Sequence, residues 1–199
     1  MSYCEITVGI SMHSHSNEPA GSRVARHLVL CGMMGSGKST VGALCARAIG
    51  VPMIDTDELV VAQSGRSVDT IFEELGEVEF RRLEAIAVAQ AAAAPDASVI
   101  ACGGGVMTQA ANREALRKTG FVVWLDASVE VLAHRVGSGI GRPLLQGAEP
   151  IAVLTRLDTI RRPVYDQCAD VRIETSAMSR AETVRAVLDA FEARVINDR

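Results

Sequence analysis

Short apolar runs alternate along the chain with longer stretches in which apolar positions recur every three or four residues. The short runs predict buried strands, and the longer stretches predict helices with one apolar face. We expect strands at 27–31, 52–54, 98–102, 121–125 and 169–173. We expect helices at 41–49, 57–64, 67–75, 77–94, 109–118, 128–136, 150–167 and 179–195. This alternation is typical of βαβ units, so the sequence predicts an α/β fold with a parallel sheet.

Residues 1–25 stand apart from this pattern because they are polar and lack sustained periodicity. We expect them to form a flexible extension, followed by a single domain over 26–199. His13 and His15 could in principle bind a metal ion, but two histidines without a further nearby ligand make a poor site.

Composition and charge narrow the choice of partners. The 199 residues carry a formal net charge of −4, which argues against a nucleic-acid partner. No apolar run approaches the roughly 18 residues that span a membrane, and no signal peptide is recognisable, so we expect a cytoplasmic protein. The five cysteines are dispersed without a CxxC pair and are expected to be free thiols.

The segment GMMGSGKST at 32–40 lies between an expected strand and an expected helix. Its order of glycines, lysine and serine is that of a P-loop, in which backbone N–H groups and a helix N-terminus hold phosphates. Lys38 would reach the β- and γ-phosphates, and Ser39 would offer a hydroxyl to Mg²⁺. The alternative is an ordinary glycine-rich turn with a solvated lysine. The strand–loop–helix context favours binding of a nucleoside triphosphate.

Two carboxylates, Asp55 and Asp57, directly follow the expected strand 52–54. At the edge of the sheet that carries the P-loop, Asp55 could support Mg²⁺ through water, and Asp57 could face a second substrate. The alternative is that Asp57 only caps the next helix. Two carboxylates beside an expected Mg-ATP site favour the functional interpretation.

Two further segments carry chemistry that could bind a second substrate. On a helix, Glu77, Arg81 and Glu84 share one face, so Arg81 could form a surface ion pair or grip a substrate carboxylate. The three consecutive glycines Gly103–Gly105 follow a strand, where a plain turn rarely needs three. Close approach of a ligand to their backbone N–H groups would explain them.

Arginines also occur in the last third of the chain. Arg142 lies in a glycine-rich stretch that could be a closing lid or a disordered surface loop. Arg135, one turn before it, could stack on a nucleotide base. In Arg161-Arg162-Pro163, either arginine could grip an anion or be solvated, and Pro163 should kink the helix or mark its boundary.

Taken together, these residues resemble the shikimate kinase family over essentially all of 26–199. The matching motifs are GMMGSGKST (32–40), DTD (55–57), FRRLE (80–84), CGGGV (102–106), GRPLL (141–145) and RRPVY (161–165). The resemblance implies a three-layer P-loop NTPase fold like that of the nucleoside-monophosphate kinases, with a five-stranded parallel sheet. It also implies transfer of the ATP γ-phosphoryl group to the 3-hydroxyl of shikimate, in chorismate and aromatic amino-acid biosynthesis.

The same resemblance implies roles for individual residues. Nucleotide phosphates would be held by Gly35, Ser36, Gly37, Lys38, Ser39 and Thr40, with Arg135 and Arg142 as further ATP contacts and Arg142 as the lid arginine. Ser39 and Asp55 would hold one Mg²⁺. Asp57 would contact the reacting hydroxyl, Arg81 and Arg161 would clamp the shikimate carboxylate, and Gly103, Gly104 and Gly105 would contact the ring hydroxyls. Residues 57–84 would form a substrate-binding subdomain, and about 137–149 the lid.

The resemblance also points to the loop after the last strand, where relatives often place an arginine against the adenine. Here that loop is Thr175–Ser179, with Arg180 slightly beyond it. ATP and shikimate are the expected partners, without nucleic acid or membrane, and we expect a monomer.

Three other functions share some of these features. A gluconate kinase would share the ATP half, but Arg81, Arg161 and the triple glycine favour a carboxylated ring. A GTPase switch would need an Asn-Lys-x-Asp motif for guanine, and this chain has none. A degenerate kinase acting as a regulator should lose a catalytic charge, yet Lys38, Asp57 and Arg142 are all present.

Overall fold

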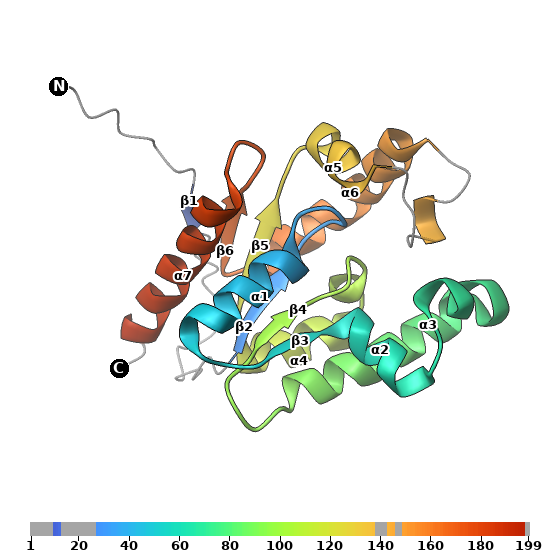
Figure 1. The fold of residues 1–199 in the computed structure, drawn as a ribbon, viewed down its shortest axis with the longest axis horizontal. Helices are drawn as coiled ribbons and strands as arrows, with labels where there is room; N and C mark the ends of the chain where they lie inside the picture. The colour runs from blue at the N-terminus through green and yellow to red at the C-terminus, as the bar shows by residue number, and fades with distance from the viewer. Residues whose placement is uncertain (1–9, 13–26, 138–142, 146–148, 198–199) are drawn as a thin grey trace.

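The protein folds around one twisted sheet with helices on both faces (Figure 1). The structure, a computed structural model, describes residues 10–12, 27–137, 143–145 and 149–197. The strand order is β1-β6-β5-β2-β4-β3. The strands are β1 (Ile10–Met12), β2 (His27–Cys31), β3 (Met53–Asp55), β4 (Val99–Ala101), β5 (Gly120–Asp126) and β6 (Val171–Glu174).

Strands β2 to β6 are all parallel, which confirms the predicted five-stranded parallel sheet. Strand β1 was not predicted. It pairs antiparallel with β6, with Ile10 opposite Ile173, and adds a sixth strand at that edge. The other residues of 1–25 lie outside the described part of the chain.

The helices form the two outer layers. They are α1 (Lys38–Ile49), α2 (Thr56–Ser64), α3 (Val68–Ala92), α4 (Ala110–Thr119), α5 (Val129–Val136), α6 (Pro150–Cys168) and α7 (Arg180–Asn197), with 3₁₀ turns η1 (Val106–Thr108) and η2 (Pro143–Leu145). α1 and α7 cover one face of the sheet, and α3, α4 and α6 cover the other.

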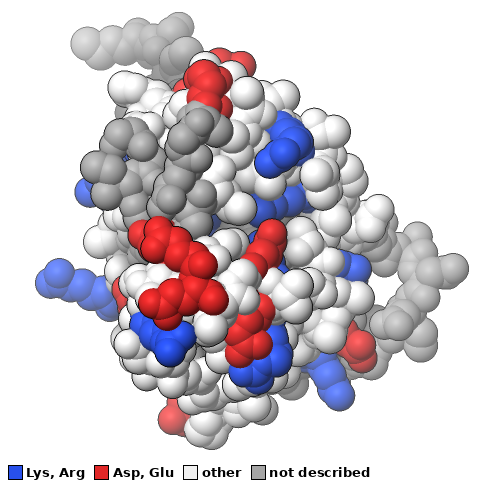
Figure 2. All heavy atoms as spheres, turned by 90° about the vertical axis from the view of Figure 1, so that its right-hand side faces the viewer, with Lys and Arg blue, Asp and Glu red and all other residues white. Residues whose placement is uncertain are grey.

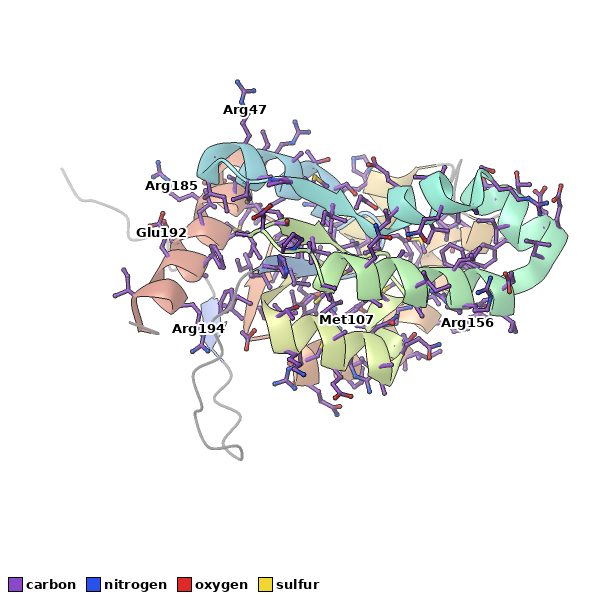
Figure 3. The ribbon with its side chains drawn as sticks, turned by 90° about the horizontal axis from the view of Figure 1, so that it is seen from below. Arg47, Met107, Arg156, Arg185, Glu192 and Arg194 are labelled. Carbon is purple, nitrogen blue, oxygen red and sulfur yellow. The ribbon has the colours of Figure 1, made fainter. Side chains whose placement is uncertain are left out.

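Side chains of β5 alternate between two hydrophobic cores, one on each face of the sheet. Phe121, Val123 and Leu125 point toward α1 and α7, whereas Val122 and Trp124 point toward the opposite helices. Successive strand residues face opposite sides, so a strand covered on both faces is apolar throughout. Met107 of η1, labelled in Figure 3, is fully buried in the core between the sheet and helices α3, α4 and α6.

Two interruptions predicted along the helices can be located in the structure. The break predicted between residues 75 and 77 is confirmed, because Gly76, with a non-helical φ of 79° and ψ of 171°, divides α3 (Val68–Ala92) into two helical segments. Pro163 was expected to kink its helix or to mark its boundary; α6 continues past it to Cys168, so Pro163 is not the boundary. Arg161 and Tyr165, on either side of Pro163, are both buried, so tertiary packing holds the helix together across the lost hydrogen bond.

Helices α2 and α3 enclose a small core of their own, formed by Val60, Ile71, Phe80 and Ala87. It is separate from the two larger cores on either side of the sheet. The α2–α3 end faces the viewer in Figure 2, where acidic and basic side chains lie interspersed. The separate core is consistent with the predicted subdomain at 57–84, although that division stays a prediction.

Two expectations from composition can be compared with the described residues. None of the helices that the structure describes is long and apolar enough to cross a membrane. The four described cysteines, Cys31, Cys45, Cys102 and Cys168, are free and buried, as predicted. Burial raises the pKa of Cys45 to about 11, so this side chain packs as an uncharged thiol.

Candidate active site

A cavity of about 570 Å³ lies at the edge of the sheet where the parallel strands end. The P-loop follows β2, Asp55 ends β3, Gly103 and Gly104 follow β4, and Thr175 follows β6. Ligands of open α/β sheets bind at this carboxyl edge. The lining residues are Met34, Gly35, Ser36, Gly37, Lys38, Ser39, Thr40, Val41, Asp55, Asp57, Cys102, Gly103, Gly104, Arg135, Thr175, Met178, Arg180 and Thr183.

The P-loop has backbone angles that only glycine adopts easily. Gly32 has φ 140°, and a side chain there would collide with the backbone carbonyl of Leu125. Gly37 has φ 96° and directly precedes α1, whose first residue is Lys38. The N-terminus of α1 therefore opens toward the cavity, with its free N–H groups and positive dipole end available for an anion.

Lys38 is 8% exposed, and its Nζ donates to the carbonyl oxygen of Met33 at 2.9 Å. Burial lowers the pKa of Lys38, and the Asp57 carboxylate is the largest influence in the opposite direction. A buried ammonium group with few polar neighbours is poorly stabilised, so an anion entering the cavity would gain a strong interaction with it.

Ser39 and Asp55 are joined directly, since Ser39 Oγ donates to Asp55 Oδ2 at 2.6 Å. The other carboxylate oxygen of Asp55 accepts from the backbone N–H of Asp57 at 3.0 Å and of Glu58 at 3.4 Å. Asp55, not Asp57, is therefore the N-cap of α2. The capping alternative considered for Asp57 is wrong, and its side chain lies instead against Gly103 on the cavity wall.

The three consecutive glycines allow three charged side chains to approach the backbone. A side chain at Gly103 would collide with the Asp57 carboxylate, one at Gly104 would meet Arg161 Nη1 at 3.2 Å, and one at Gly105 would collide with the Arg81 guanidinium. None of these glycines has a positive φ. The structure thus gives one reason for the glycines, the close packing of protein side chains, while the expected ligand contact at this loop stays a prediction.

Arg81 is held by two carboxylates of its own helix, as the spacing predicted. Its Nη1 donates to both oxygens of Glu84, at 3.0 and 2.8 Å, and its Nη2 donates to Glu77 at 3.0 Å. Glu84 is almost fully buried, and burial raises its pKa, although the charges of Arg81 and Arg161 oppose that shift. Arg81 is therefore fixed in place against Gly105 and not free on the surface.

The neighbouring arginines Arg161 and Arg162 have different environments. Arg161 is 5% exposed, and its buried Nη1 makes no hydrogen bond to another described residue. Arg162 is fully engaged, with a two-pronged ion pair to Asp126 at 2.8 and 3.0 Å and a further one to Asp158 at 2.8 Å. Of the two, Arg161 is the one whose guanidinium keeps a donor that no described residue uses, although it is not among the residues that line the cavity. By contrast, Arg47 and Arg185 project outward from the molecule in Figure 3.

Asp126 anchors a cluster behind the site. Arg172 also binds its carboxylate, at 2.6 Å, and the guanidinium groups of Arg162 and Arg172 lie over the Trp124 ring at 5.2 and 4.8 Å. The ring of Tyr165 is 5.8 Å from that of Trp124. The cluster ties α6 to the ends of β5 and β6.

Part of the cavity lining comes from α5, the loop after β6 and the start of α7. Arg135 lines the cavity, but its guanidinium Nη2 donates to the carbonyl of Thr175 at 2.9 Å. Met178 and Arg180 line it as well, from the loop after β6 and the start of α7. The sequence had pointed to Arg135 as a base contact and, through the resemblance, to the loop Thr175–Ser179 with Arg180, whereas Thr183 was not predicted.

Arg142 lies outside the described residues. Of the predicted lid, the structure describes Gly137, Pro143–Leu145 and Glu149. Leu145 is buried in the core on the α6 side of the sheet.

Comparisons with known proteins agree with this geometry. The shikimate kinase family model matches residues 34–192. A shikimate kinase of Symbiobacterium thermophilum is 49% identical over 170 residues, covering 84% of this chain and 97% of the relative. One of Caulobacter vibrioides is 42% identical over 167 residues, covering 84% and 82%. The solved shikimate kinase of Acinetobacter baumannii, in complex with shikimate, superposes with a TM-score of 0.82 at 34% identity, covering 86% of this chain and 96% of that one. The chain therefore belongs to the shikimate kinase family.

Proposed function

We propose that this chain transfers the γ-phosphoryl group of ATP to the 3-hydroxyl of shikimate, giving shikimate 3-phosphate and ADP for aromatic amino-acid biosynthesis. One observation carries the choice of acceptor. Arg81 of α3 and Arg161 of α6 both lie against the glycine loop 103–105, next to Asp57. Two guanidinium groups beside a carboxylate suit an acceptor that has a carboxylate to be gripped and a hydroxyl to be oriented.

The nucleotide binds along the P-loop. Backbone N–H groups of Gly35, Ser36, Gly37, Ser39 and Thr40 hold the phosphates, at the N-terminus of α1. Lys38 exchanges its hydrogen bond with the Met33 carbonyl for the β- and γ-phosphate oxygens. Arg135, which lines the cavity, is the proposed contact of the base, and Arg142 belongs to the proposed lid over the phosphates.

The oxygen ligands present fit one Mg²⁺ ion. Ser39 Oγ and Asp55 Oδ2 are 2.6 Å apart, so both face the same point at the rim of the P-loop. The described residues contain no group of three or more histidines, cysteines or carboxylates able to hold a metal by themselves. This suits Mg²⁺, which takes one or two protein oxygens together with phosphate oxygens and water. The bound ion supplies positive charge next to the transferred phosphoryl group.

Asp57 orients the nucleophile. The shikimate 3-hydroxyl oxygen attacks the γ-phosphorus while the bond to the leaving ADP oxygen breaks, and the hydroxyl proton passes to Asp57. The transition state of phosphoryl transfer is loose, so the proton leaves late and positioning of the hydroxyl is the larger contribution. Lys38 and Arg142 stabilise the charge that spreads over the phosphoryl oxygens. The protein acts as a cytoplasmic monomer, in which residues 57–84 carry the acceptor and about 137–149 close over ATP.

The test is ADP release from Mg-ATP, measured with shikimate and with gluconate in separate assays. We expect turnover with shikimate only. Arg81→Ala should raise the KM for shikimate by about a hundredfold while the KM for ATP stays near the wild-type value, because a charge-assisted grip on the carboxylate is lost.

The matched control is Arg82→Ala, because Arg82 pairs with Glu79 on the exposed side of the same helix. This variant should behave like the wild type. Turnover with gluconate alone would discard the acceptor assignment, and turnover with neither compound would contradict the proposed kinase activity.

A further inference from the structure

The glycine loop 103–105 needs rigidity that its own residues do not provide. Three consecutive glycines leave the backbone conformationally free. Yet the guanidinium groups of Arg81 and Arg161 both lie against this loop. If the loop moved, the contacts that each arginine makes with it would change. Something outside the loop must therefore hold it.

Each peptide of the loop makes at least one hydrogen bond. The N–H of Gly103 donates to Thr56 Oγ1 at 2.8 Å, and the carbonyl of Gly103 accepts from the N–H of Val106 at 3.1 Å. The carbonyl of Gly105 accepts from both the N–H and the hydroxyl of Thr108, at 3.0 and 2.6 Å. These partners come from the start of α2 and from η1.

The central peptide, between Gly104 and Gly105, is held by Tyr165 of α6. The Tyr165 hydroxyl donates to the Gly104 carbonyl at 2.6 Å. Tyr165 is 1% exposed, and burial raises the pKa of its hydroxyl, which keeps this group protonated as a donor. A trans peptide is planar, so a fixed Gly104 carbonyl also fixes the N–H of Gly105, on the opposite side of the same peptide.

Tyr165 also lies four residues after Arg161 on α6, so the two side chains share one helix face. The hydroxyl of one holds Gly104, while the guanidinium of the other lies against the same glycine. The turn η1 that follows the loop contacts α3 as well as α6. The loop thus lies between the helices that carry Arg81 and Arg161.

We propose that Tyr165 is a positioning residue for the acceptor: by holding the Gly104–Gly105 peptide, its hydroxyl sets the separation of Arg81 and Arg161. This inference rests on the proposed function, since it concerns how that acceptor's carboxylate is bound. It assigns no role to Tyr165 in nucleotide binding, because the Tyr165 hydroxyl contacts Gly104 and Met33 Sδ and no P-loop N–H group.

The test is Tyr165→Phe, which removes only the hydroxyl, with shikimate affinity measured by calorimetry and both KM values measured by ADP release. We expect shikimate to bind about tenfold more weakly, since an oriented hydrogen bond is lost, while the KM for ATP stays within about twofold of the wild type. Thr119→Val is the matched control. It removes a hydroxyl that donates to the Ala115 carbonyl at 3.1 Å, away from the loop, and it should leave shikimate binding unchanged.

A purely structural role would lower the melting temperature of Tyr165→Phe and leave shikimate affinity intact, which would overturn the inference. If Tyr165→Phe does not fold, 3-fluorotyrosine in the wild-type sequence provides a second test. The chain has only two tyrosines, Tyr3 and Tyr165, and Tyr3→Phe assigns the signals. The ¹⁹F resonance of Tyr165 should move when shikimate is added, and a resonance that does not move would also overturn the inference. A wild-type protein inactive with shikimate would contradict the proposed function itself.

Discussion

The substitution Gly105→Ala tests why a glycine loop adjoins the two arginines. The new methyl group would lie 2.6 Å from Cζ and Nη2 of Arg81, about 0.8 Å short of the 3.4 Å at which ordinary contact begins. Gly105 has φ −97°, a conformation that alanine also adopts, so the backbone itself is not strained. The strain falls on the Arg81 side chain, which Glu84 and Glu77 hold from behind.

We therefore expect the Arg81 guanidinium to be displaced by nearly 1 Å in Gly105→Ala. A displacement of that size in a binding group costs about a hundredfold in the affected step. The KM for shikimate should rise by about this factor, and the KM for ATP should not change, both measured by ADP release. Gly42→Ala, in α1, is the control, because its methyl group would meet only side chains, at 3.4 Å or more. A Gly105→Ala enzyme with normal shikimate KM would refute the close-approach explanation.

Three further predictions concern charged residues. Asp57→Asn should lower kcat by at least about a hundredfold while ATP still binds with wild-type affinity in calorimetry, and normal turnover would contradict its role. Arg162→Gln should lower the free energy of unfolding by about 1–2 kcal/mol in denaturant titrations and leave both KM values unchanged, whereas Arg82→Gln should cost less than about 0.5 kcal/mol. Lys38→Met should abolish transfer but stabilise the fold near neutral pH. Burial lowers the pKa of Lys38 in the folded state below the reference value of 10.5. Between these two pKa values the unfolded chain binds more protons than the folded protein. The free energy of unfolding of the wild type therefore rises with pH in this window. In Lys38→Met, the free energy of unfolding measured at several pH values should lack this rise with pH.

The parallel sheet and the nucleotide half of the site were predictable because their signals are local. A buried parallel strand is an apolar run, and the P-loop is a contiguous segment between a strand and a helix. Even the shared face of Arg81 and Glu84 follows from helical spacing alone. Each of these inferences needed only a few neighbouring residues.

What the sequence could not predict depends on contacts between distant segments. Nothing near Gly103–Gly105 indicated that three side chains from elsewhere in the chain would pack against them. Adjacent Arg161 and Arg162 look equivalent in sequence, and only the position of Asp126 at the end of β5 separates their roles. Strand β1 has three residues and no periodicity, so only its pairing with β6 identifies it.

The surroundings of Trp124 have an optical consequence. It is the only tryptophan of the chain, so all indole fluorescence originates from β5. Two guanidinium groups lie over its ring, and one of them belongs to Arg162 of α6. The emission of an indole responds to nearby charge, so a shift of α6 relative to the sheet would change its wavelength or intensity. Arg161 and Tyr165 are also on α6, so a shift of α6 on binding of the proposed acceptor would be visible in the tryptophan emission of the unlabelled protein.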